Sequence, residues 1–99
     1  MLEKFKKYTI KYRTHALKRM MERNISFIEI DEIVENMEII KEYPEDKPFQ
    51  SYLTLGFTAI KRPIHMVFSI DEQERVIFII SVYEPDSLKW ENDFKRRKK

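Results

Sequence analysis

The sequence has no cysteine and only one glycine among its 99 residues. The lack of cysteine excludes a disulfide framework and a thiolate metal site, and two histidines are too few to dominate a metal centre. We therefore expect neither a metal ion nor another cofactor. One glycine and four prolines also exclude a collagen-like chain, and no glycine-rich phosphate-binding loop is present.

Long apolar runs are missing as well. The N-terminal segment MLEKFKKYTIKYR places charges where a signal peptide needs an unbroken apolar core. No apolar run approaches the length needed to span a membrane. We therefore expect a soluble, cytoplasmic protein with no membrane partner, and the lack of cysteine is compatible with a reducing cytosol.

Charge of one sign is not in large excess, but the two signs are separated along the chain. The net charge is +2, from 19 Lys and Arg against 17 Asp and Glu. Basic residues are concentrated in residues 4–23 and 95–99, whereas residues 29–38 are almost purely acidic. Such a separation can create a local anion-attracting surface that the net charge hides. The alternative is that both segments are ordinary solvated faces.

A chain of 99 residues is long enough for one compact domain and too short for two that each bury a sufficient core, and its 42% of apolar residues is typical of a folded domain. We expect a single domain over residues 1–99, with its compact core over about residues 8–94 and a basic end at 95–99. The oligomeric state does not follow from the sequence.

The first half of the chain has helical periodicity after a short strand. The run YTIKY alternates as a strand does, and Thr14 is a candidate N-cap for a helix over residues 14–23. Asn24 suits a left-handed C-cap. Ser26 and Glu29 have the spacing of a capping box at the start of a second amphipathic helix.

The second half has the pattern of a sheet. Four β-rich runs follow one another from residue 38, separated by charged or proline-containing turns, and the apolar run VIFIISV belongs near the centre of the sheet. The segment LKWENDFKRRKK is predicted to form a final helix. The order is β-α-α-β-β-β-β-α, an α+β fold in which helices pack on one face of a curved, mainly antiparallel sheet. The other face stays partly open for a ligand or a partner.

The predicted core combines apolar residues of the helices with those of the last strand. Its members are Leu17, Met20, Ile30, Ile33, Val34, Ile77, Ile79 and Val82.

Three side chains on the first of these helices form a stripe. His15, Arg19 and Arg23 recur every fourth residue, so they advance slowly around the helix and can face one ligand. Two guanidinium groups at this spacing suit phosphate, because arginine stays charged and donates paired hydrogen bonds. The alternative is the solvated border of an amphipathic helix with Arg–Glu surface pairs.

Other candidate residues lie in the strands. Alternation places His65 on the sheet face opposite Ile64 and Met66, and a histidine in a strand is either a structural residue or a site residue near Arg62. Tyr83 and Glu84 end the last apolar strand, from which polar side chains can reach a cleft. Trp90 is interpreted as an anchor for the predicted final helix.

The segments HALKRMMERNIS, KRPIHMVFSI and IISVYEPDSLKW together resemble the bacterial family called domain of unknown function 4258. The resemblance extends over about residues 8–90. Asn24 stands where glycine is frequent, and Ser81 stands where threonine is frequent. The function of the family is not known, so the resemblance implies no activity. The most specific pattern, H-A-x-x-R-M-x-x-R followed by I-S, is matched by His15, Ala16, Arg19, Met20, Arg23, Ile25 and Ser26.

The predicted order of elements is similar to that of the RelE and BrnT toxins, small bacterial ribonucleases that an antitoxin holds inactive. This similarity implies a site on the concave sheet face beside the helix of residues 14–23, with RNA and an antitoxin as partners. Catalytic residues differ between branches of that superfamily, so none is transferred to this chain.

RNA cleavage without a metal needs a base, an acid and cations around the phosphorane. The alternative function is a non-catalytic module that binds a protein partner through the open sheet or a strand edge. The two hypotheses are separated by whether the two histidines share one cleft. The ribonuclease hypothesis assigns roles to seven side chains: His15 and His65 as acid and base, Tyr83 and Glu84 as assisting groups, and Arg19, Arg23 and Arg62 as phosphate-binding cations.

Overall fold

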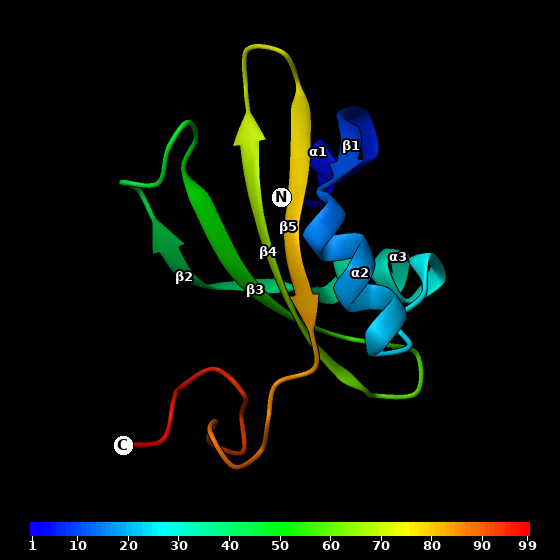
Figure 1. Cartoon of the computed structure of the whole chain (residues 1–99), viewed down its shortest axis with the longest axis vertical. Helices are drawn as coiled ribbons and strands as arrows, with labels where there is room; N and C mark the ends of the chain where they lie inside the picture. The colour runs from blue at the N-terminus through cyan, green and yellow to red at the C-terminus, as the bar shows by residue number, and fades with distance from the viewer.

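The computed structural model describes all residues 1–99 and contains a five-stranded sheet and three helices. Figure 1 shows how these elements are arranged. The α+β class predicted from the sequence is confirmed. No helix is long and apolar enough to cross a bilayer. The elements are α1 (Leu2–Lys7), β1 (Thr9–Tyr12), α2 (Thr14–Glu22), α3 (Phe27–Asn36), β2 (Glu38–Tyr43), β3 (Ser51–Phe57), β4 (Pro63–Asp71) and β5 (Val76–Tyr83).

The strands follow the order β1-β5-β4-β3-β2, so β1 and β2 form the two edges of the sheet. Strands β2 to β5 pair antiparallel with their neighbours, whereas β1 pairs parallel with β5. Strand β5 therefore lies inside the sheet, as its continuous apolar run predicts. The sheet is mainly antiparallel, with one parallel pair that the sequence pattern did not indicate.

The core lies between the sheet and the helices. From β4, Ile64, Met66 and Phe68 point toward the helices and are fully buried. The ring of Phe68 lies between Phe5, edge-on at 5.0 Å, and Tyr52, stacked at 5.4 Å. Because Phe5 belongs to α1, residues that precede the predicted core also contribute to it.

Helix α2 packs against the sheet through Ala16 and Met20, which are four residues apart and both buried. Leu17 is 38% exposed and does not belong to the buried cluster, so its assignment to the core is wrong. The physical reason is the rotation of about 100° per residue, which moves position 17 to the border of the helix when position 16 faces the sheet.

The local signals at the helix ends are mostly confirmed. Ser26 and Glu29 form the predicted capping box, with the Ser26 hydroxyl accepting from the Glu29 amide at 3.1 Å. Asn24 is left-handed with φ 53°. Helix α2 begins at Thr14, and the N-cap is Arg13 rather than Thr14.

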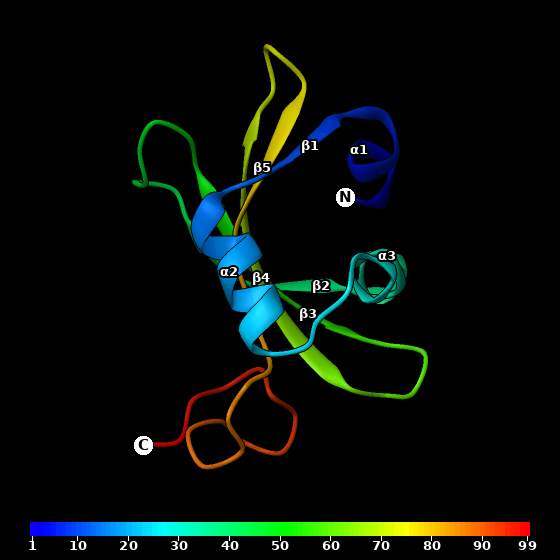
Figure 2. The same ribbon diagram turned by 45° about the vertical axis from the view of Figure 1, so that its right-hand side comes forward.

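The final helix predicted over residues 88–99 is absent, and this prediction is wrong. The segment instead forms successive turns beneath the sheet (Figures 1 and 2). The carboxylates of Asp86 and Asp93 accept the amides of Leu88 and Lys95, and Phe94 is left-handed with φ 58°. Such aspartate turns compete with helix formation, and five consecutive cations at 95–99 repel one another along a helix.

Candidate nucleic-acid interface

The face of the sheet opposite the helices carries a cluster of histidine and aromatic side chains. Strand pairing places Leu55 beside His65 and His65 beside Tyr83, so these three residues form one row across β3, β4 and β5. The alternation predicted for β4 is confirmed, because Met66 and its apolar neighbours face the helices. His65 therefore belongs to the open face.

His65 is fully buried because the C-terminal segment covers it. Its Nε2 lies 2.7 Å from the carbonyl oxygen of Phe94, and its Nδ1 lies 3.2 Å from the hydroxyl of Tyr83. A neutral ring that donates from Nε2 and accepts at Nδ1 satisfies both contacts. The Trp90 ring packs edge-on against the imidazole at 4.5 Å. Trp90 is thus an anchor, but it anchors a turn and not a helix.

Burial changes the titration of both partners in this hydrogen bond. It lowers the pKa of His65, although the hydrogen bond to Phe94 opposes this change in part. Burial also raises the pKa of Tyr83, with a further rise from Tyr43 and an opposing effect of Arg97. Both side chains are therefore neutral near pH 7. His65 holds the C-terminal segment against the sheet through its contacts with Phe94 and Trp90.

The pKa of His65 predicts acid destabilisation. Its pKa is lower in the folded state than in the unfolded state, so unfolding takes up a proton below about pH 6.5. The stability that His65 contributes is complete above this pH and is lost on acidification. Urea unfolding at pH 7.5 and pH 5.5 should show that loss, and His65→Gln should reduce it. His15→Gln is the matched control, because it leaves the contacts of His65 with Phe94 and Tyr83 in place and should retain the loss that they predict. An unchanged pH dependence in His65→Gln would contradict the prediction.

A cleft of about 440 Å³ opens beside Tyr83 on this face. The guanidinium of Arg97 lies over the Trp90 ring at 5.5 Å, and the Lys41 amine lies over the Tyr43 ring at 5.3 Å. Three aromatic rings and three cations therefore meet in one cavity. We call it the open-face cleft, and its lining residues are Ile40, Lys41, Tyr43, Leu53, Tyr83, Trp90, Lys95 and Arg97.

Of the seven predicted site residues, Tyr83 is the one that lines this cleft. Lys41, Tyr43 and Arg97 were missed. The basic run at 95–99 could have indicated a cationic site. The prediction of a final helix over these residues, however, did not place them against the sheet. The cleft exists only because the C-terminal segment turns back over β4 and β5.

His15 and His65 do not share a cleft. His15 is exposed on α2, which packs on the helix-bearing face of β5, whereas His65 is buried on the opposite face. The predicted acid–base pair of histidines is therefore not assembled. Arg19 lies on α2 and Arg23 is the C-cap residue of that helix, and neither forms an ion pair. Their role in phosphate binding stays a prediction.

Arg62 has a structural role that the sequence did not reveal. Its guanidinium donates to the Glu84 carboxylate at 2.6 Å, to Glu29 at 3.2 Å, and to the backbone carbonyls of Asn24 and Arg23 at 2.9 and 2.7 Å. These bonds join the turn between α2 and α3 to the ends of β4 and β5. Arg62 is therefore not free to bind phosphate, and Glu84 is paired rather than poised for proton transfer.

Most of the chain matches a known protein family. The family described as Domain of unknown function (DUF4258) matches residues 12–84, most of the chain. The chain belongs to this family. The matched DUF4258 region contains His65 and Tyr83, whereas Trp90 and the cations at 95–99 lie beyond it. No curated protein and no solved structure gives a significant match to the chain.

Proposed function

We propose that this DUF4258 protein binds single-stranded RNA in the open-face cleft. The observation that carries the proposal is the joint presence of aromatic rings and cations in one cavity of about 440 Å³. Bases of a single strand stack on aromatic side chains, and the backbone phosphates are attracted by lysine and arginine. Tyr43 supplies a stacking surface, and Lys41 and Arg97 supply cations.

The cations of the cleft are available for phosphate. Lys41 and Arg97 form no ion pair. Lys95 contacts Glu38 at 2.7 Å, but both side chains are about half exposed, and an exposed pair of this kind contributes little stability. Exchange of that carboxylate for a phosphate therefore costs little. Lys98 and Lys99 follow Arg97 and add positive charge at this end of the chain, which explains how a chain of net charge +2 can attract a polyanion.

RNA is preferred to DNA as the ligand because the order β-α-α-β-β-β-β from β1 to β5 retains most of the predicted order that is similar to that of the RelE and BrnT ribonucleases. As part of the same proposal, the protein acts in the cytoplasm in a toxin–antitoxin type system. A protein partner would then restrain it, as antitoxins restrain those toxins.

The test measures RNA affinity by fluorescence anisotropy with a labelled single-stranded oligouridine. Tyr43→Ala should weaken binding about tenfold through loss of base stacking. Arg97→Ala should weaken binding and lower the slope of log affinity against log salt by about one. Lys18→Ala on the exposed side of α2 is the matched control and should bind as the wild type does.

Arg19→Ala and Arg23→Ala distinguish the open-face cleft from the stripe on α2. The proposal expects the cleft variants to lose more affinity than these two. Loss of binding in Arg19→Ala and Arg23→Ala, with full binding in Tyr43→Ala and Arg97→Ala, would transfer the RNA site to α2 and refute the cleft.

A second candidate function is metal-independent cleavage of the bound RNA. The observation that favours it is the Tyr83 side chain, which lines the cleft and remains a protonated phenol because burial raises its pKa. The 2′-oxygen would attack phosphorus while its own proton passes to solvent. The Tyr83 hydroxyl, which donates to His65 Nδ1 in the free protein, would turn to the leaving 5′-oxygen and protonate it as its bond to phosphorus breaks. Tyr83→Phe should abolish the cyclic-phosphate product but retain RNA affinity. Equal cleavage by Tyr83→Phe would exclude this role.

A further inference from the structure

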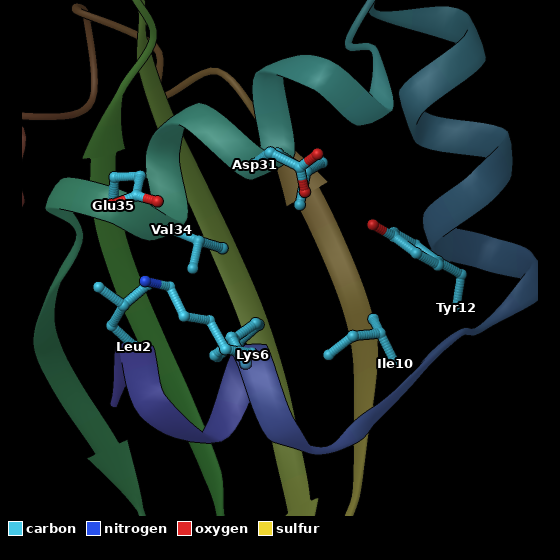
Figure 3. Close-up of a pocket in the computed structure, with 9 residues that line it drawn as sticks. Leu2, Lys6, Ile10, Tyr12, Asp31, Val34 and Glu35 are labelled. Carbon is cyan, nitrogen blue, oxygen red and sulfur yellow. The ribbon is translucent and has the colours of Figure 1, made fainter.

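The helix-bearing side of the molecule contains a second cavity of about 500 Å³, which lies between α1, β1 and α3 (Figure 3). Phe5 and Ile10 belong to its apolar lining, together with Ile30 and Val34 of α3. These four side chains pack against or belong to the core, so the cavity has a hydrophobic floor. We call it the β1 groove.

β1 contributes the side chains of Ile10 and Tyr12 to this groove, and its outer backbone edge runs alongside in the plane of the sheet. The Thr9 amide donates to the Arg75 carbonyl in the turn before β5 at 3.0 Å, and the Arg13 amide donates to the Ile79 carbonyl of β5 at 2.9 Å. In a parallel pair, alternate residues point their N–H and C=O groups to the same neighbour. Those of Ile10 and Tyr12 therefore point away from β5, and no other strand lies on that side of β1.

The rim of the groove along α3 is acidic. Asp31 and Glu35 are one helical turn apart, both are exposed, and neither forms an ion pair. Figure 3 shows both on the α3 side of the groove, with the hydroxyl end of Tyr12 directed toward α3. Lys6 is the cation on the opposite, α1 side. A segment that lies along the outer edge of β1 would therefore direct alternate side chains to the helix-bearing side of the sheet, toward this apolar lining and its two carboxylates.

We propose that the β1 groove binds an extended segment of a partner protein, in which apolar residues alternate with lysine or arginine. The segment adds a strand to the free edge of β1, with its apolar side chains in the groove and its cations toward Asp31 and Glu35. Strand addition uses main-chain hydrogen bonds for affinity and pockets for alternate side chains for specificity. A helix is disfavoured as the occupant because its backbone groups are already paired within it.

This binding site is independent of the proposed RNA site. The β1 groove lies on the helix-bearing side of the sheet, and the open-face cleft lies on the other side. The two sites share no lining residue. Loss of one function therefore leaves the other measurable on the same protein.

The experiment selects binders to the full chain from a display library of random ten-residue peptides. We expect the enriched peptides to alternate apolar and basic residues. In hydrogen exchange of the complex, the amides of Ile10 and Tyr12 should become protected, while those of β2, the other edge strand, should not. Methylation of the peptide's own backbone nitrogens that face β1 should weaken binding about tenfold. Enrichment of acidic peptides, enrichment of none, or protection at β2 would overturn the proposal.

Charge reversal on α3 supplies the second measurement. Asp31→Lys should weaken the selected basic peptides about tenfold or more and should leave oligouridine binding unchanged. Glu22→Lys, an exposed reversal on α2 at a carboxylate that forms no ion pair, is the matched control and should bind the peptides as the wild type does. Equal affinity of the wild type and Asp31→Lys for the selected peptides would show that the acidic rim takes no part in peptide recognition. A concentration-dependent dimer that protects Ile10 and Tyr12 without any peptide would assign the edge to a second copy of the chain.

Discussion

Replacing Gly56 with valine should lower the free energy of unfolding by about 3 kcal/mol or more, at the upper end of the range for overpacking. Gly56 lies in β3 with its missing side chain directed at α3. A Cβ atom there would lie 2.6 Å from the Cβ of Ile33 and 2.8 Å from the Ile33 carbonyl oxygen. Because one of these atoms belongs to the backbone, the contact is relieved only by moving the helix.

Equilibrium urea unfolding measures this loss, and the slope of the transition shows whether the folded state stays compact. Gly56→Ala should have a smaller effect in the same direction. Thr9→Val is the control for adding a valine to a strand at an exposed position, and it should change the free energy of unfolding by less than about 0.5 kcal/mol. Wild-type stability in Gly56→Val would mean that α3 does not pack on β3 as described.

Truncating Ile79 to alanine should cost about 2–5 kcal/mol of unfolding free energy. Ile79 is completely buried in the core cluster, on a strand that has neighbours on both sides. Removal of three carbon atoms at such a position loses their transfer free energy and leaves a cavity that the surrounding strands and helices cannot close fully.

The measurement is again equilibrium denaturation, with Ile60→Ala as the matched control. Ile60 lies in the turn before β4 and is 83% exposed, so the same truncation there should cost less than about 0.5 kcal/mol. A loss below about 1 kcal/mol in Ile79→Ala would mean that β5 is not an interior strand.

Much of the fold was predictable because its signals are local. The capping box of Ser26 and Glu29 and the left-handed Asn24 depend on neighbours within three residues. The alternation in β4 identified which side chains share a face with His65. The apolar run of β5 indicated an interior strand, since a strand at a solvated edge has polar residues on one side.

The errors occurred where distant contacts override local preference. Helix α1 is short and was not predicted, and its Phe5 is ordered by the ring of Phe68, far away in the sequence. The C-terminal segment has helix-forming lysines, but Trp90 and the Phe94 carbonyl are held by His65. Tertiary packing of this kind outweighs differences in helix propensity, which are about a few tenths of a kcal/mol per residue in peptides.

The candidate sites likewise depend in part on local spacing and in part on contacts between distant segments. Spacing along the sequence predicts that His15, Arg19 and Arg23 form one stripe, whereas α2 ends at Glu22 and Arg23 is its C-cap residue. The partners of Arg62 were decided in space, where one guanidinium meets two carboxylates from distant segments.

The sequence by itself determined the family, the faces of the helices and strands, and the separation of positive from negative segments. The tertiary structure alone decided that β1 pairs parallel with β5, which leaves a free edge beside an acidic helix, and that residues 85–99 fold back to form the open-face cleft. The physical reason is the separation along the sequence of the residues that interact. Helical and strand periodicity follows from bonds and contacts between near neighbours, whereas both sites are made by segments that meet only after the sheet has formed.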